Sequence, residues 1–138
     1  TPVITAVPNV MHAVQHFYIT VRTTELNLVD TEGLITIRIP KDIRWVFDGP
    51  YDSNLTVLGS TTLNNSAWVY SEDSTHHIFK STTVIPAGGF SYFGFKAIWN
   101  AGQTRGRYTI TSQIDSWSGG EDRIDNNVDA ERLDYFIN

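Results

Sequence analysis

The sequence contains no cysteine among its 138 residues. Disulfide bridges, thiolate metal ligands and a cysteine nucleophile are therefore excluded. Positive charge is also sparse, because ten Lys and Arg residues stand against fifteen Asp and Glu, and the basic residues form no run. A net charge of −5 is poorly suited to neutralising phosphates, so we expect no nucleic-acid partner.

Long apolar runs are missing as well. No stretch approaches the roughly 18 consecutive apolar residues of a membrane helix, so we expect no membrane insertion. Helical periodicity is scarce too, and only Asn127 to Leu133 has room for a single helical turn. The length fits one domain, which we assign to residues 1–138.

The dominant pattern is an alternation of apolar and polar residues, interrupted by Gly, Pro, Asn and Asp. The alternating runs are Val3–Val7, Phe17–Thr23, Leu34–Ile39, Ile43–Phe47, Trp68–Tyr70, His77–Lys80, Thr83–Ile85, Phe90–Trp99, Tyr108–Ile114 and Leu133–Ile137. Short strands at regular spacing with turn signals between them are typical of sandwiches. The sequence therefore predicts an all-β fold, an antiparallel β-sandwich of about seven to nine strands.

Three of the four tryptophans, Trp45, Trp68 and Trp99, follow the apolar alternation of their strands, and we expect them in the core. Trp117 precedes Ser118-Gly119-Gly120 in a loop and is the exposed candidate. Because exposed aromatic rings can stack on sugars, Trp117 is the candidate ligand-binding residue for a surface glycan.

A cluster of carboxylates and amides lies between the last two predicted strands, within residues 119–131. Ca²⁺ needs six to eight oxygen ligands. The residues able to supply several of them are Asp122, Asp125, Asn127, Asp129 and Glu131. Their spacing differs from an EF-hand loop, and the alternative is a turn whose side chains bond its own amides. Ca²⁺ is the single candidate cofactor; otherwise we expect none.

The histidines do not form a metal site in this pattern. His76 and His77 are adjacent, so on a strand they point to opposite faces, and His12 and His16 lie apart in an extended chain. A zinc site needs three or four converging ligands, so we expect ordinary surface histidines. No nucleophile-elbow, phosphate-loop or zinc-protease motif occurs, and we therefore expect no enzyme.

Several stretches in a fixed order resemble a known family. They are Pro8-Asn9-Val10-Met11, residues 33–41, residues 63–68, Ile85-Pro86-Ala87-Gly88-Gly89, and Ser118-Gly119-Gly120-Glu121 with Asp125-Asn126-Asn127. Together they are similar to the immunoglobulin-like conserved repeat domain of large bacterial surface or exported proteins, in the form found in gliding-type bacteria. The resemblance implies an immunoglobulin-like sandwich without enzymatic activity, located outside the cell in stalks, adhesins or surface fibres.

These observations favour a non-catalytic extracellular module, structural or adhesive, on a bacterial cell surface. One alternative is a subunit that assembles into a filament by strand exchange between copies, and another is a carbohydrate-binding module. Because Val3–Val7 and Leu133–Ile137 lie at the two ends of the sequence, we expect contact with copies of the chain or with sister domains, end to end, through the first or last strand.

Overall fold

The computed structural model of the chain describes residues 2–24, 35–58, 61–81, 85, 89–102, 104–114 and 128–136. The strands in these ranges are β1 (Pro2–Val7), β2 (Val10–His12), β3 (Gln15–Thr24), β4 (Ile35–Pro40), β5 (Trp45–Phe47), β6 (Val57–Leu58), β7 (Thr61–Thr62), β8 (Val69–Glu72), β9 (His76–Ser81), β10 (Phe90–Trp99), β11 (Gly106–Ile114) and β12 (Val128–Phe136). Helical structure in the described ranges is limited to the 3₁₀ turn η1 (Asn65–Ala67).

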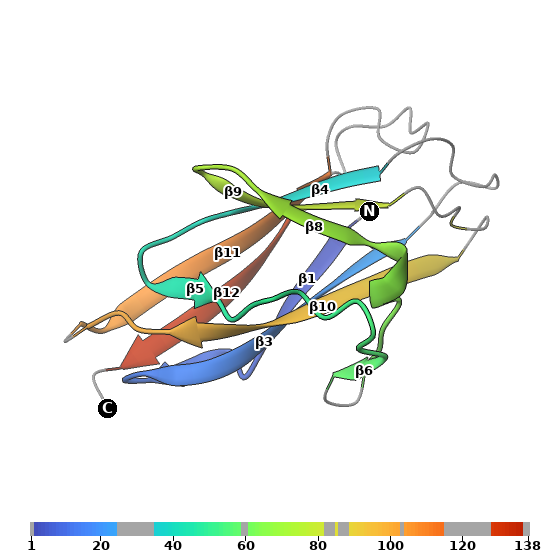
Figure 1. Ribbon diagram of the computed structural model, residues 1–138. Helices are drawn as coiled ribbons and strands as arrows, with labels where there is room; N and C mark the ends of the chain where they lie inside the picture. Colours follow the sequence, from blue (N-terminus) through green and yellow to red (C-terminus); the bar gives the residue numbers. More distant parts are fainter. Residues whose placement is uncertain are drawn as a thin grey trace.

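The strands form two large sheets that pack face to face (Figure 1). One sheet has four strands in the order β1-β3-β10-β5, and the other has six in the order β2-β12-β11-β4-β9-β8. Strands β6 and β7 form a small hairpin. All pairings are antiparallel except that of β2 with β12. The predicted all-β, immunoglobulin-like sandwich is confirmed, and the structure adds short strands in stretches that resemble turns.

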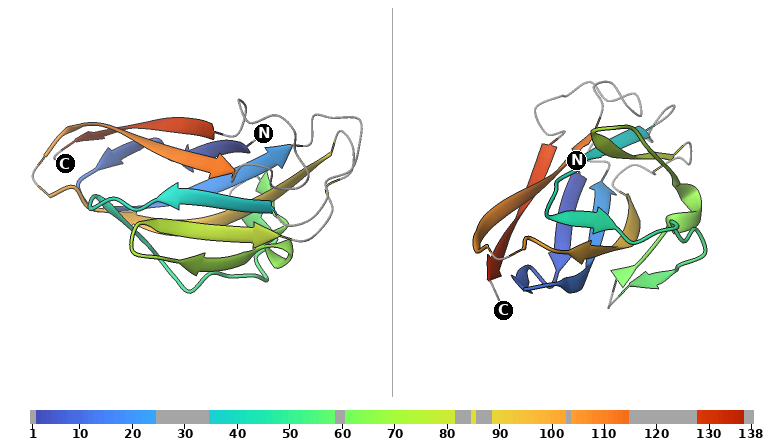
Figure 2. Two further views of the ribbon diagram at one scale, coloured as in Figure 1. Left: turned by 90° about the horizontal axis from the view of Figure 1, so that it is seen from above. Right: turned by 60° about the vertical axis from the view of Figure 1, so that its left-hand side comes forward.

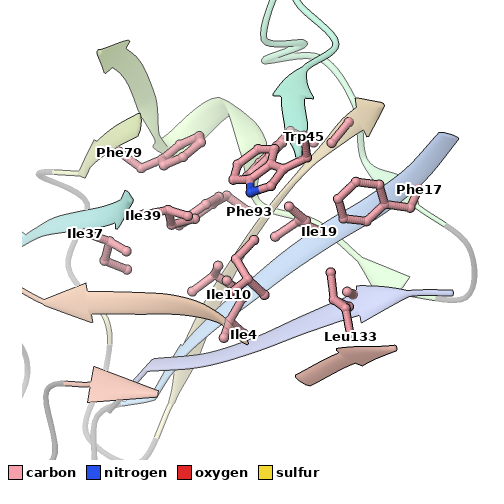
Figure 3. Close-up of a cluster of buried hydrophobic side chains, with 14 of the residues drawn as sticks. Ile4, Phe17, Ile19, Ile37, Ile39, Trp45, Phe79, Phe93, Ile110 and Leu133 are labelled. Carbon is pink, nitrogen blue, oxygen red and sulfur yellow. The ribbon is translucent and has the colours of Figure 1, made fainter. Parts of the chain in front are cut away.

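The core lies between the two sheets and is built by the alternation seen in the sequence (Figure 3). Its members come from inward positions of both layers: Phe17, Ile19 and Val21 of β3; Phe93, Phe95, Ala97 and Trp99 of β10; and Ile35, Ile37 and Ile39 of β4. Each of these side chains is at most 3% exposed. Because successive side chains of a strand point to opposite faces, the alternation in the sequence accounts for these inward positions.

The three tryptophans expected in the core are buried, which confirms that prediction. Trp45, Trp68 and Trp99 are 2%, 1% and 0% exposed. The Trp45 indole N–H donates to the Tyr108 hydroxyl (3.1 Å) and links β5 to β11 in the facing sheet. The Trp68 indole N–H donates to the Ser91 hydroxyl (3.0 Å), so both indole N–H groups have hydrogen-bond partners in the interior.

Two predicted boundaries were wrong. Ile43 does not start a strand; it is 97% exposed, and β5 begins only at Trp45. The reason is a local turn in which the Asp42 carboxylate accepts both the Arg44 main-chain N–H (2.9 Å) and its Nε–H (2.8 Å). The last strand starts at Val128 rather than Leu133, so residues 128–133 contain no helical turn. The predicted strand Thr83–Ile85 falls largely outside the described residues.

Side chains seal the outer edge of β1. Asp129 and Glu131 share the inward face of β12 with Leu133, because they are two residues apart along the strand. Asp129 Oδ2 accepts the main-chain N–H of Ile4 (2.9 Å), and Glu131 Oε2 accepts that of Ala6 (3.2 Å). These carboxylates occupy main-chain donors that would otherwise be open to strand addition.

A pair of asparagines seals the free edge of β10 in a similar way. The Asn64 N–H and Oδ1 bond the Tyr92 carbonyl and N–H, at 2.7 and 2.9 Å. The Asn65 side chain donates to the Gly94 carbonyl and accepts the Gly94 N–H, both at 2.9 Å. Asn65 Nδ2 also donates to the Asp52 carbonyl (2.9 Å), so this buried amide replaces a neighbouring strand and holds the 48–55 segment against β10.

We predict that Asn65→Ala destabilises the fold more than Asn64→Ala. Asn65 is 1% exposed, so its loss leaves the buried Gly94 N–H and carbonyl without partners, at about 1–3 kcal/mol for each group. The Asn64 side chain is exposed, and water can replace its bond to Tyr92. Urea denaturation of the two variants checks this, and equal losses of unfolding free energy would contradict the role given to Asn65.

Candidate functional site

The residues predicted to bind Ca²⁺ are only partly described. Asp122, Asp125 and Asn127 lie outside the described residues, as does Trp117. Asp129 and Glu131 are described, and both carboxylates accept main-chain N–H groups of β1. Within the described ranges, no three His, Asp or Glu side chains gather closely enough to hold a metal ion. The same ranges hold no helix with the length and apolarity of a membrane span.

The expectation that all histidines are surface residues was wrong for one of them. His12 and His16 are exposed as expected, and His76 is half-buried, but His77 is only 4% exposed. The signal that could have identified it is its spacing: His77 lies two residues before Phe79 on β9, so both point to the core. Buried polar residues are uncommon, so a histidine ring on the core side of a strand indicates a candidate functional site more clearly than any motif in the sequence.

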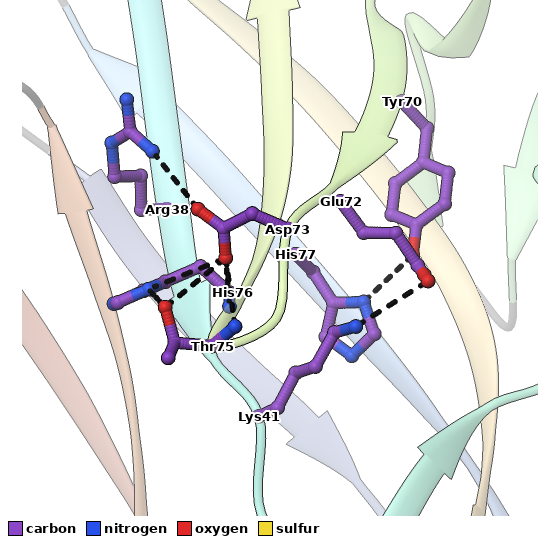
Figure 4. A network of polar contacts seen from close by, with 8 residues as sticks. All are labelled: Arg38, Lys41, Tyr70, Glu72, Asp73, Thr75, His76 and His77. Carbon is purple, nitrogen blue, oxygen red and sulfur yellow. Dashed lines mark hydrogen bonds and ion pairs between the residues drawn. The ribbon is translucent and has the colours of Figure 1, made fainter.

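The β8–β9 hairpin carries His77, and its strands overlap the predicted runs Trp68–Tyr70 and His77–Lys80. Its turn is held by Asp73, whose Oδ1 accepts the N–H of Thr75 (2.8 Å) and of His76 (2.7 Å) (Figure 4). These main-chain bonds lower the pKa of the Asp73 carboxyl. Arg38 of β4 lies 3.9 Å from the other Asp73 oxygen and fastens the turn to the neighbouring strand.

Beside this turn, four side chains from three segments form one connected polar network (Figure 4). The Tyr70 hydroxyl lies 2.6 Å from Glu72 Oε2 and 2.7 Å from His77 Nδ1. Lys41 Nζ, just after β4, lies 3.3 Å from Glu72 Oε1. Tyr70 and Lys41 thus occupy both oxygens of Glu72, and the hydrogen bond from Tyr70 and the ammonium of Lys41 lower the pKa of its carboxyl.

The proton positions in this network follow from donor counting. An ionised carboxylate only accepts, so the single proton of the Tyr70 hydroxyl goes to Glu72. Burial, reinforced by Glu72, raises the pKa of Tyr70 and keeps that proton in place. His77 Nδ1 must then donate to the Tyr70 oxygen. In the neutral ring this leaves Nε2 as a hydrogen-bond acceptor.

His77 is neutral over most of the pH range. Burial lowers the pKa of its imidazole to about 4, and Lys41 acts in the same direction. The Glu72 carboxylate opposes this shift without overcoming it. The ring also sits among aromatic rings, with centroids 5.0 Å from Trp45 and 5.6 Å from Phe47. Protonation would therefore place a charge against apolar walls.

Two surface pockets share Phe47 as a wall. The first, of about 270 Å³, is lined by Lys41, Asp42, Trp45, Phe47, Glu72 and His77, and we call it the His77 pocket. The second, of about 260 Å³, lies along the 48–55 segment and includes Asp48, Asp52 and Lys96. Phe47 is stacked against Tyr70 and Phe95, with ring centroids 4.4 and 4.9 Å apart, so it forms a firm partition.

The comparisons with known proteins bear on the fold. No family model matches the chain, and no curated protein matches it. Among solved structures, the CARDB domain of a Pyrococcus furiosus protein, crystallised in complex with di-metal ions, has a TM-score of 0.57 at 14% identity, covering 100% of this chain and 93% of that chain. A chain of a CaDoc0917–CaCohA2 complex has a TM-score of 0.48 at 12% identity, with full coverage of both chains. The likeness to the CARDB domain supports the immunoglobulin-like sandwich and extends to fold alone.

We predict that the unfolding free energy falls as the pH is lowered from about 6.5 to about 4. In that window the unfolded chain protonates His77 while the folded chain does not, so the unfolded state binds more protons. The loss is at most about 3 kcal/mol, and the His77 contribution is constant above pH of about 6.5. Urea denaturation across this range measures it.

The comparison that isolates the effect uses His77→Gln, which cannot titrate but can still donate to Tyr70. Its unfolding free energy should depend less on pH than that of the wild type. His76→Gln, one residue away on the opposite face of β9, should keep the wild-type slope. An unchanged slope in His77→Gln would contradict the assignment.

A further prediction concerns the acidic segment. A ligand that binds only the folded state raises its melting temperature. We expect no change in melting temperature on adding EDTA or millimolar Ca²⁺, because Asp129 and Glu131 already accept hydrogen bonds from β1. Scanning calorimetry decides between the two cases, and a Ca²⁺-dependent rise would assign a metal to residues 122–131.

Proposed function

We propose that this chain is a non-catalytic, extracellular structural or adhesive module of a bacterial cell-surface protein, with residues 1–138 acting as one domain. The sandwich architecture supports this proposal, because its side chains fill a packed core and bond the main-chain groups at the sheet edges. The sequence motifs that resemble the surface-protein repeat domain point in the same direction.

The observation that carries the proposal is the placement of the first and last strands. Strand β1 begins beside Thr23, at the end of β3, whereas β12 finishes beside His12, near the start of β3. These points lie toward opposite ends of the long axis of the sandwich (Figure 2). Modules of this shape joined in series would follow one another along that axis, as in a stalk.

The end of the sandwich where β12 finishes is rich in exposed apolar side chains, and we call it the β12 pole. They are Val7, Val10, Val14, Ile43 and Phe136. Ile43 is 97% exposed at a turn tip, a large apolar exposure for a surface residue. The proposed role for this pole is to pack against a neighbouring copy or sister domain.

This form of end-to-end contact differs from strand exchange. Strand β1 pairs with β3 on one side and bonds Asp129 and Glu131 on the other, while β12 pairs with β11 and β2. Adding a strand from another copy along β1, or along Asp134–Phe136 of β12, would first have to break these bonds. Packing of exposed ends requires no such rearrangement, so we favour it over a strand-exchange filament.

The test is self-association of the purified chain, measured by sedimentation velocity over a range of concentrations. We predict concentration-dependent association that Ile43→Asp weakens by about tenfold or more, since a charge replaces a buried apolar contact. Val69→Asp on β8 is the matched control, because Val69 is also exposed (69%) but lies away from the β12 pole. A wild-type chain that stays monomeric throughout, or equal effects of the two variants, would remove the packing role.

Location is tested separately. Antibodies against the folded domain should label intact cells of the source organism without permeabilisation. Labelling only after permeabilisation would contradict an extracellular module.

A further inference from the structure

We propose that the His77 pocket binds an uncharged hydroxylated ring, a sugar unit of a surface glycan. This site adjoins the β12 pole, because Ile43 lies between the pocket residues Asp42 and Trp45 in the sequence. The inference itself does not depend on end-to-end packing. It is carried by the hydrogen-bonding groups that the pocket presents and by the balance of charge around them.

The first argument is the set of groups that the pocket offers. His77 lines the buried wall, and Nε2 of its ring is an acceptor because Nδ1 donates to Tyr70. The rim of the pocket has the Lys41 ammonium, which has three N–H donors and contacts one carboxylate oxygen. A ligand must therefore donate at one point and accept at another nearby. A hydroxyl group does both, and neighbouring hydroxyls on a ring provide the two functions a short distance apart.

The second argument is charge. Lys41 is paired with Glu72, and Asp42 is paired with Arg44 through two bonds of 2.8 and 3.1 Å. Each charge that lines the pocket thus has an opposite charge beside it. An anionic or cationic ligand would have to compete with one of these pairs, whereas a neutral polar ligand leaves both intact.

The third argument is size and wall chemistry. The volume of about 270 Å³ is slightly below the range of pockets that hold drug-sized molecules, and it suits a single small ring. Trp45 and Phe47 supply apolar walls, and Phe47 is fixed by stacking on Tyr70 and Phe95. Because His77, Tyr70 and Glu72 are already bonded to one another, the polar groups are held in place before a ligand arrives.

The experiment is an NMR titration of the intact chain that follows the ring nitrogens of His77. In the free protein, Nδ1 should carry the proton and Nε2 should not. On addition of millimolar glucose, galactose, mannose or N-acetylglucosamine, the Nε2 resonance should shift with at least one sugar, and the shift should saturate. No shift with any of the four, or a proton already on Nε2, would overturn the proposal.

Two variants locate the site. Binding to the variants is followed on the indole N–H resonance of Trp45, which also lines the pocket. His77→Phe keeps an aromatic ring and should abolish the saturable shift of that resonance, whereas His76→Phe should leave it unchanged. If His77→Phe fails to fold, Lys41→Met serves instead, because the Lys41 side chain is 31% exposed at the rim. It should weaken binding by about tenfold or more, the value of one hydrogen bond to a charged group. Equal binding by wild type and Lys41→Met would overturn the proposal.

The charge argument has its own comparison. Glucuronate differs from glucose by one carboxylate and should bind more weakly, because it disturbs the Lys41–Glu72 pair. Tighter binding of glucuronate would show that the pocket selects an anion and would overturn the neutral-ligand assignment. The titrations use a protein concentration at which sedimentation velocity shows a monomer, so failure here is distinguishable from failure of the module proposal.

Discussion

The structure depends on how the open edges of its two sheets are satisfied. An edge strand presents a row of main-chain donors and acceptors that must find partners or remain open to other chains. Here the partners are side chains: Asp129 and Glu131 for β1, Asn64 and Asn65 for β10. The two sheets stay separate layers because these bonds replace the strands that would otherwise join or extend them.

The same need for hydrogen-bond partners orders the His77 region. A buried imidazole is costly unless its nitrogens have partners, and the Tyr70 hydroxyl supplies one of them. Tyr70 in turn needs Glu72, and Glu72 needs Lys41, so one buried ring orders residues from β8, β9 and the segment after β4. The second ring nitrogen of His77, Nε2, is an acceptor that takes no part in this network. His77 also lines a pocket.

Most of the fold could be predicted from the sequence, because alternation with a period of two directly specifies which side chains face the core. The inward sets of β3, β4 and β10 and the three buried tryptophans follow from it. The first half of β12 could not, because its inward positions are Asp129 and Glu131, and carboxylates at core-facing places look like a turn. These carboxylates face inward because they accept main-chain N–H groups of β1, which lie 125 residues away in the sequence. No local pattern encodes such a contact. The burial of His77 could have been predicted from its spacing to Phe79. Its contacts with Tyr70 and Lys41 could not, because they depend on the register of β8, β9 and β4.

An edge that is sealed by side chains restricts where the molecule can meet a partner. Pairing through β1 or β10 would break charged or buried hydrogen bonds, whose loss costs more than a solvated pair contributes. The two proposed contact surfaces, the β12 pole and the His77 pocket, need no such rupture. The exposed apolar side chains of the pole suit the proposed packing against a neighbouring module. The pocket is small and polar, with its charges already paired, so it suits a small neutral ligand. The two proposals therefore assign different classes of partner to the two surfaces, and neither requires the sandwich to open.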